Sequence, residues 1–67
     1  MGDVKLGKTL KEAREKLGLT QKQVAEKTGL STNWYARYER GKENALQETR
    51  DRILKVLKIK ISYEVKD

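Results

Sequence analysis

The stretch from residue 19 to residue 40, LTQKQVAEKTGLSTNWYARYER, decides the fold. Thr20 and Gln23 stand three residues apart, which is the spacing of a capping box at a helix start. Ser31 is a second N-cap candidate, and a hydrophobic residue precedes each cap, as in a hydrophobic staple. Gly29 lies between them, and glycine readily adopts the positive φ of a tight turn. The stretch therefore predicts two short helices joined by a glycine turn, over residues 21 to about 28 and 32 to about 40.

Apolar residues predict one helix before this stretch and one after it. The earlier helix has an apolar stripe at steps of four, three and four residues, formed by Leu6, Leu10, Ala13 and Leu17. Gly18 follows directly, in the position that ends a helix. Gly41 and a polar loop precede the later helix, for which Asn44 is the predicted N-cap with Gln47 at the third position. Its predicted apolar side consists of Leu46, Ile53, Val56 and Leu57.

From residue 58 the hydrophobic period changes from that of a helix to that of a strand. Ile59, Ile61, Tyr63 and Val65 alternate with polar residues, which predicts a β-strand. A lone strand cannot satisfy its own backbone groups, so it needs a partner strand. The sequence thus predicts a helical domain over residues 1–57 and a strand-forming tail over residues 58–67.

The composition excludes several classes of function. The 67-residue chain has no Cys and no His, which removes disulfides, zinc-finger ligand sets, thiol nucleophiles and imidazole chemistry. Because no catalytic set or phosphate-binding glycine loop is recognisable, we expect neither an enzyme nor a bound metal or cofactor. No signal peptide or membrane span is recognisable, so we expect a cytoplasmic protein without a membrane partner. The net charge of +6 favours a polyanionic partner.

Two short helices joined by a glycine turn, the second polar on one side, form the architecture that places a helix in the major groove. Several segments in order resemble the XRE, or phage repressor and Cro-like, helix-turn-helix family: LGLTQ at 17–21, VAEK at 24–27, GLS at 29–31, ERGK at 39–42 and ET at 48–49. The resemblance covers about residues 6 to 59. It implies an all-α, four- to five-helix repressor-like DNA-binding domain, with the helix-turn-helix at about residues 20–40 and double-stranded DNA as the partner.

The resemblance also implies roles for individual side chains. Thr32, Asn33 and Arg37 stand where the family reads base edges, and Gln21 stands where it meets a backbone phosphate. The residue types agree with a base-reading role, because Arg can bond guanine O6 and N7 and Asn can form a similar pair of bonds with adenine. Further DNA-backbone contacts are expected around this face from Lys22, Trp34, Arg40, Lys42 and Asn44. For Trp34 two alternatives stay open, namely contact with a thymine methyl group and packing over the predicted helix at residues 21–28.

Arg14 and Glu39 match a pair that forms a structural ion pair in phage repressors. We therefore assign Glu39 to orientation and not to DNA contact or catalysis. An exposed pair of this kind contributes ~0 to 1 kcal/mol, so its loss should be tolerated unless Arg14 also meets a phosphate. The chain departs from the family where Tyr35 and Tyr38 replace the usual aliphatic residues, and we expect both in the core.

The tail resembles the dimerising C-terminal strand of HipB-like antitoxins. Two copies related by a two-fold axis would form an antiparallel intermolecular β-ribbon through Ile59, Ile61, Tyr63 and Val65. In the alternative, the tail folds back over the first helix or lies beside residues 4–6 of its own chain. The ribbon predicts a homodimer that presents two recognition helices on one face of DNA.

Together these features predict a sequence-specific transcriptional regulator, with repression by occlusion as the simplest mode, that binds a palindromic operator as a homodimer. The competing hypothesis is a protein-interaction module, or an antitoxin that binds a toxin, in which DNA binding is secondary.

Overall fold

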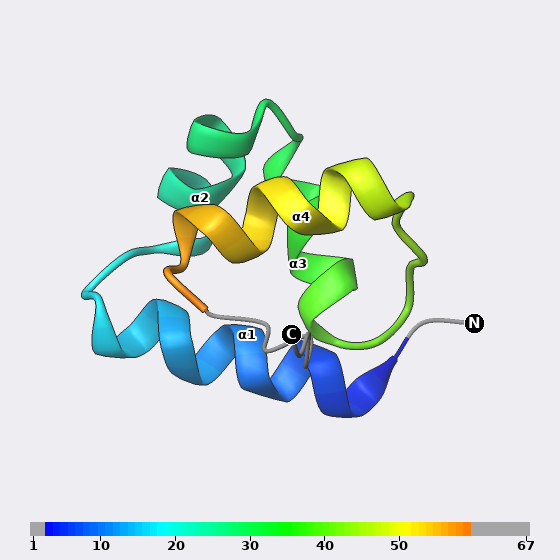
Figure 1. Ribbon diagram of the computed structural model, residues 1–67, viewed down its shortest axis with the longest axis horizontal. Helices are drawn as coiled ribbons and strands as arrows, with labels where there is room; N and C mark the ends of the chain where they lie inside the picture. The colour runs from blue at the N-terminus through cyan, green and yellow to red at the C-terminus, as the bar shows by residue number, and fades with distance from the viewer. Residues whose placement is uncertain (1–2, 60–67) are drawn as a thin grey trace, which may run out of the picture.

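The computed structural model describes residues 3–59, which form four helices (Figure 1). They are α1 (Val4–Lys16), α2 (Gln21–Thr28), α3 (Thr32–Glu39) and α4 (Gln47–Val56). Helix α3 packs against α1 and α2, and α2 also packs against α4 (Figure 1). The described part of the chain is thus all-α, as predicted, whereas the predicted contacts of Ile61, Tyr63 and Val65 lie outside the described residues.

The predicted start signals of α2 and α3 are both formed. The Thr20 hydroxyl accepts a hydrogen bond from the Gln23 backbone N–H at 3.0 Å, and the Gln23 side-chain oxygen accepts one from the Thr20 N–H at 2.8 Å. The Ser31 hydroxyl accepts a bond from the Trp34 N–H at 3.1 Å. These bonds satisfy N–H groups that the first turn of a helix leaves free, so α2 and α3 begin where the sequence predicts.

Each described helix ends in the same backbone motif. A residue in the left-handed conformation follows the helix, with φ of 71°, 74°, 76° and 58° at Gly18, Gly29, Gly41 and Lys58. The next N–H then bonds to the carbonyl five residues earlier, as in a Schellman motif. These bonds join Leu19 to Arg14, Leu30 to Ala25, Lys42 to Arg37 and Ile59 to Leu54. Lys58 and Ile59 therefore close α4, and the prediction that a strand begins at residue 58 is wrong.

Two details of α4 also differ from the prediction. Leu46, and not Asn44, is the N-cap, and it makes no side-chain capping bond. Residues 44–46 stay outside the helix, and Ala45 packs against the core, so tertiary packing overrides the local capping signal. Leu46 is 76% exposed, and Leu54 is a core residue that the sequence interpretation had not assigned.

The core lies where the four helices meet and contains both tyrosines of α3, as predicted. Its buried hydrophobic residues are Leu10, Val24, Ala25, Tyr35, Tyr38, Ile53, Leu54 and Leu57. Thr28 is also buried, but its hydroxyl donates to the carbonyls of Val24 and Ala25, at 2.7 and 3.1 Å, so its polar group is satisfied. Within residues 3–59, no helix has both the length and the apolar character that crossing a bilayer requires.

Candidate nucleic-acid interface

One face of α3 is polar and open to solvent. Thr32, Asn33 and Arg37 are exposed, and Arg40 follows on the same side at the end of the helix. The opposite face carries the buried residues of α3, namely Tyr35, Tyr38 and Glu39. Because the core fixes the inner face, the outer face presents the three predicted base-reading side chains together.

The loop after α3 extends this surface. Lys42 and Asn44 are exposed in the loop, and Lys22 is exposed in the first turn of α2. The loop starts from a fixed point, because the Gly41 N–H bonds to the Tyr38 carbonyl at 3.0 Å and the Lys42 N–H bonds to the Arg37 carbonyl at 2.9 Å. The backbone thus holds Lys42 against the end of α3, beside the predicted reading face.

Gln21 has a second partner that the sequence did not reveal. Its side-chain N–H₂ donates to Glu39 Oε1 at 3.0 Å, so the predicted phosphate-contacting residue is tied to α3. Gln21 is also the first residue of α2, where backbone N–H groups point out of the helix and attract anions. The side-chain bond fixes the start of α2 relative to α3, on the side where the loop and Arg40 lie.

Two lysines of α1 adjoin this surface, and the sequence interpretation did not include them. A shallow groove is lined by Val4, Lys8, Lys11, Gln21, Glu39 and Arg40. Lys8 and Lys11 are exposed and lie three residues apart, on one side of the helix. The only sequence signal for them was their spacing, which is common on any solvated helix. The groove adds the start of α1 to the candidate interface.

Arg14 and Glu39 form the predicted ion pair, but the pair is not exposed. Arg14 Nε lies 2.7 Å from Glu39 Oε2, and the two side chains are 11% and 3% exposed. The premise that the pair is exposed is therefore wrong. Because removing one partner leaves a buried charge uncompensated, we now expect loss of the pair to destabilise the fold. The assignment of Glu39 to orientation agrees with this burial.

Burial and hydrogen bonding act in opposite directions on Glu39. Burial by itself raises the pKa of this carboxyl, but the hydrogen bonds from Arg14 and Gln21 outweigh burial and hold the pKa below its ordinary value. Burial, and then the neighbouring Glu39 carboxylate, raise the pKa of the Tyr35 hydroxyl. That hydroxyl is buried without a hydrogen-bond partner among residues 3–59. Both groups keep their charge state at neutral pH, so this part of α3 supports the interface without titrating.

Trp34 stacks on Tyr38 within α3. The ring centroids are 5.0 Å apart and the planes are inclined by 18°. Trp34 is half-buried and packs against the core from its margin. This contact accounts for part of the indole surface, and the predicted contact of Trp34 with the DNA backbone stays a prediction for the part that remains exposed.

Arg37 has a carboxylate partner that the sequence interpretation missed. Arg37 Nε lies 2.6 Å from Glu43 Oε2, and the side chains are 47% and 27% exposed. The two residues are six apart and lie on either side of the end of α3. No helical spacing rule connects such positions, so the sequence held no signal for this pair.

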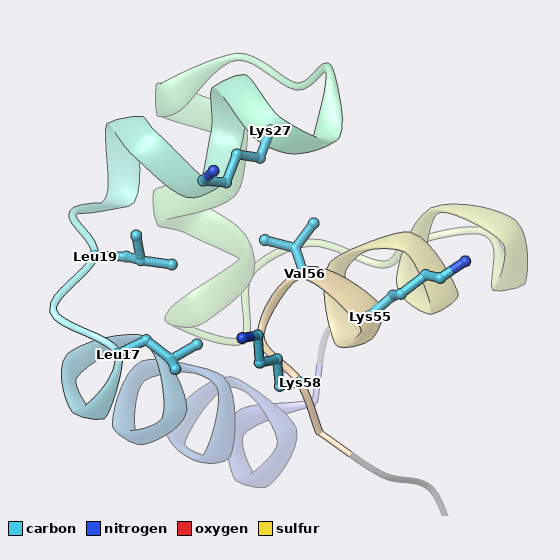
Figure 2. A pocket seen from close by; sticks show the side chains of 6 residues that line it. All are labelled: Leu17, Leu19, Lys27, Lys55, Val56 and Lys58. Atoms are coloured by element: carbon cyan, nitrogen blue, oxygen red, sulfur yellow. The ribbon is translucent and has the colours of Figure 1, made fainter.

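A separate pocket lies away from the residues predicted to contact DNA. Figure 2 shows three aliphatic side chains and three lysines around it: Leu17, Leu19, Val56, Lys27, Lys55 and Lys58. They come from the end of α1, the following loop, α2 and the end of α4, and none of them belongs to α3. The outer face of α3 and this pocket are therefore distinct surfaces.

The order of helices, the glycine turn between α2 and α3 and the exposed polar face of α3 define a helix-turn-helix DNA-binding protein. A comparison with protein-family models agrees, since the helix-turn-helix family HTH_3 matches residues 10–63. The chain belongs to this family, that of the XRE-type helix-turn-helix regulators. A search of curated proteins finds no significant match. The family is one of DNA-binding transcription regulators and is not typically enzymatic.

Proposed function

We propose that this chain is a sequence-specific transcriptional repressor that binds a palindromic operator as a homodimer. The observation that carries the proposal is the outer face of α3, where Thr32, Asn33 and Arg37 are exposed together while the tyrosines of the same helix are buried. In a helix-turn-helix, residues at the start and on the outer face of the second helix contact base edges in the major groove. Repression then follows by occlusion of the operator.

Base reading rests chiefly on two side chains of α3. The Arg37 guanidinium pairs with guanine O6 and N7, and the Asn33 amide pairs with adenine N6 and N7. Thr32, at the first position of α3, contacts a neighbouring base through its hydroxyl or methyl group. Each bidentate contact contributes ~1 to 3 kcal/mol of discrimination against the wrong base.

The phosphates are contacted from both sides of α3. The N-terminus of α2 supplies Gln21 and Lys22, and the loop after α3 supplies Lys42 and Asn44. Further contacts come from Trp34, from Arg40 and from the two lysines of the α1 groove, Lys8 and Lys11. Every Lys or Arg that neutralises a phosphate releases counterions, so log K falls against log salt concentration with a slope of about −0.9 for each contact.

The dimer rests on the alternation of Ile61, Tyr63 and Val65 in the tail. Ile59 does not belong to this set, because it packs against the core of its own chain and closes α4. Residues 4–6 are the first turn of α1, which removes them as a strand partner for the tail. An intermolecular ribbon related by a two-fold axis places the two α3 helices on half-sites ~34 Å apart.

Selection from a random pool of DNA duplexes tests the proposal directly. We expect enrichment of one sequence with two-fold symmetry, and we expect Arg37→Ala to lose the preference at one base pair of each half-site. Trp34 is the only Trp, so its fluorescence reports binding of the selected duplex. The proposal is contradicted if the affinity for DNA does not change between low and physiological salt, or if the selection enriches no sequence. Either result favours a protein-interaction module.

The dimer has its own test in the full-length chain. Ile61→Lys combined with Val65→Lys should convert a dimer to a monomer in sedimentation equilibrium at micromolar concentration. Lys60→Ala with Lys66→Ala, on the opposite face of the predicted strand, is the control that should leave the mass unchanged. A double variant that is still dimeric overturns the proposed ribbon without affecting the assignment of base reading.

A further inference from the structure

The ion pair between Arg37 and Glu43 joins the reading face of α3 to the loop that follows it. Arg37 Nε donates to Glu43 Oε2 at 2.6 Å. Arg37 is the more exposed partner, with 47% of its side chain accessible against 27% for Glu43. The carboxylate is therefore the better-held member of the pair, and the guanidinium extends from it toward solvent.

The backbone anchors the two residues before Glu43 to the end of α3. The Lys42 N–H bonds at 2.9 Å to the carbonyl of Arg37 itself, and Gly41 is held by the Tyr38 carbonyl. Glu43 follows these two anchored residues directly. Glu43 thus directly follows the closed turn that ends α3, and its carboxylate reaches back to Arg37.

The bond engages one edge of the guanidinium and leaves the other open. Arginine has five N–H groups, of which one is on Nε and four are on the two Nη atoms. With Nε bonded to Glu43, the paired Nη groups at the far end keep their N–H bonds for a planar acceptor pair. Guanine O6 and N7 form such a pair in the major groove, and Arg binds them with two N–H groups.

The charge of Glu43 also restricts where the Arg37 side chain can go. An arginine without such a partner rotates freely and can bond phosphates as well as bases, which gives affinity without sequence information. A carboxylate at Nε holds the guanidinium over the reading face and keeps a negative charge beside it, which repels a phosphate at that edge. The pair therefore favours base contact over backbone contact for this side chain.

We propose that Glu43 is a positioning residue for base recognition, which holds Arg37 through Nε so that its Nη groups select guanine. This inference rests on the proposed function, because it requires that Arg37 reads a base. Glu43 acts through Arg37 and need not touch DNA itself.

The test uses the full-length chain and a duplex selected by the wild-type protein. Arg37→Ala first identifies the base pair whose preference depends on Arg37. Glu43→Gln should then reduce the preference for guanine at that same base pair about tenfold, on the order of what one bidentate contact supplies. Glu48→Gln removes the same charge from an exposed position five residues on and should leave the preference intact.

Two measurements separate positioning from other roles. In the Arg37→Ala background, Glu43→Gln should cause no further change at that base pair. The melting temperatures of Glu43→Gln and Glu48→Gln should agree within about 3 °C, since an exposed ion pair contributes little to stability. A preference lost together with a large fall in melting temperature overturns the inference, because it makes Glu43 a structural residue.

A carboxylate that merely competes with DNA gives the opposite result. Glu43→Gln would then bind the selected duplex more tightly than Glu48→Gln does, with the guanine preference unchanged, and the inference would be overturned. A wild-type chain that enriches no sequence overturns the proposed function and this inference together. Enrichment with identical base profiles for wild type and Glu43→Gln overturns this inference alone.

Discussion

Arg14 and Glu39 form a two-point ion pair that connects α1 to α3. Arg14 Nε donates to Glu39 Oε2 at 2.7 Å, and Nη2 donates to Oε1 at 3.2 Å. The third nitrogen of the same guanidinium, Nη1, donates to the Leu19 carbonyl at 2.9 Å. One side chain thus ties together α1, the loop before α2, and α3. Its removal affects the placement of the helix-turn-helix relative to the rest of the domain.

We predict that Arg14→Ala lowers the free energy of unfolding by about 3 to 5 kcal/mol, because it leaves the buried Glu39 carboxylate without its counter-charge. The matched control is Arg37→Ala, which breaks the exposed pair with Glu43 and should cost at most about 1 kcal/mol. Urea denaturation of both variants measures the difference. Equal losses in the two variants would show that burial does not distinguish the pairs.

The same carboxylate predicts how stability depends on pH. The pKa of Glu39 is lower in the folded chain than its ordinary value of 4.5, so the unfolded chain takes up the proton first as the pH falls. The contribution of Glu39 is therefore complete above about pH 5.5, and it is lost as the pH falls through 4.5 toward the folded pKa. Melting temperatures between pH 7 and pH 3 should decline less steeply for Glu39→Gln than for wild type. Glu12→Gln, at an exposed position of α1, should follow the wild-type slope.

We predict that Gly7→Ala destabilises the fold although alanine is the better helix former. Gly7 is buried where α1 meets α3, and a Cβ there would lie 2.8 Å from the Glu39 carbonyl carbon and nearer still to its oxygen. Forcing the helices apart costs about 1 to 3 kcal/mol, more than the ~1 kcal/mol that helix propensity returns. Thermal denaturation of Gly7→Ala beside Glu12→Ala, at an exposed position of the same helix, provides the comparison. A rise in melting temperature for Gly7→Ala would contradict the close approach of α1 and α3.

Lys58 offers a substitution that should increase stability. It occupies the left-handed position after α4 that glycine occupies after the other three described helices, with φ of 58°. Because a side chain in this conformation costs about 1 kcal/mol and glycine avoids that cost, Lys58→Gly should raise the free energy of unfolding by about 0.5 to 1 kcal/mol. Lys55→Gly, within α4, removes the same charge and should lower stability by about 1 kcal/mol. If the free energy of unfolding rises for Lys58→Gly and falls for Lys55→Gly, the left-handed turn is confirmed. A fall in both variants contradicts it.

The bounds of α2 and α3 could be predicted from the sequence because their start and stop signals are local. Thr20, Gln23 and Ser31 satisfy backbone groups within three residues of themselves, and Gly29 adopts its conformation regardless of the rest of the fold. The exposure of Asn33 and Arg37 could also be predicted, because the period of a helix places both residues on its polar side. Local chemistry was therefore sufficient for the helix-turn-helix and for the face of α3 that it presents.

Features that depend on contacts between distant segments could not be predicted in this way. The N-cap of α4 is Leu46 and not Asn44, and Ala45 between them packs on the core, which no local signal records. The burial of the Arg14 and Glu39 side chains depends on the approach of two helices 25 residues apart in sequence. Gly7 was overlooked for the same reason, although an isolated glycine within a helical pattern often marks close packing.

The bond between Arg37 and Glu43 has a consequence for attempts to transfer or redesign this binding surface. A graft of α3 alone would end at Glu39, the last residue of the helix. Such a graft would carry the arginine into a new scaffold without its carboxylate, which lies four residues beyond the helix. A graft extended through residue 43 would transplant donor and acceptor together. With the role that we propose for Glu43, the smallest portable specificity element of this chain is a helix together with its closing turn and the residue that follows.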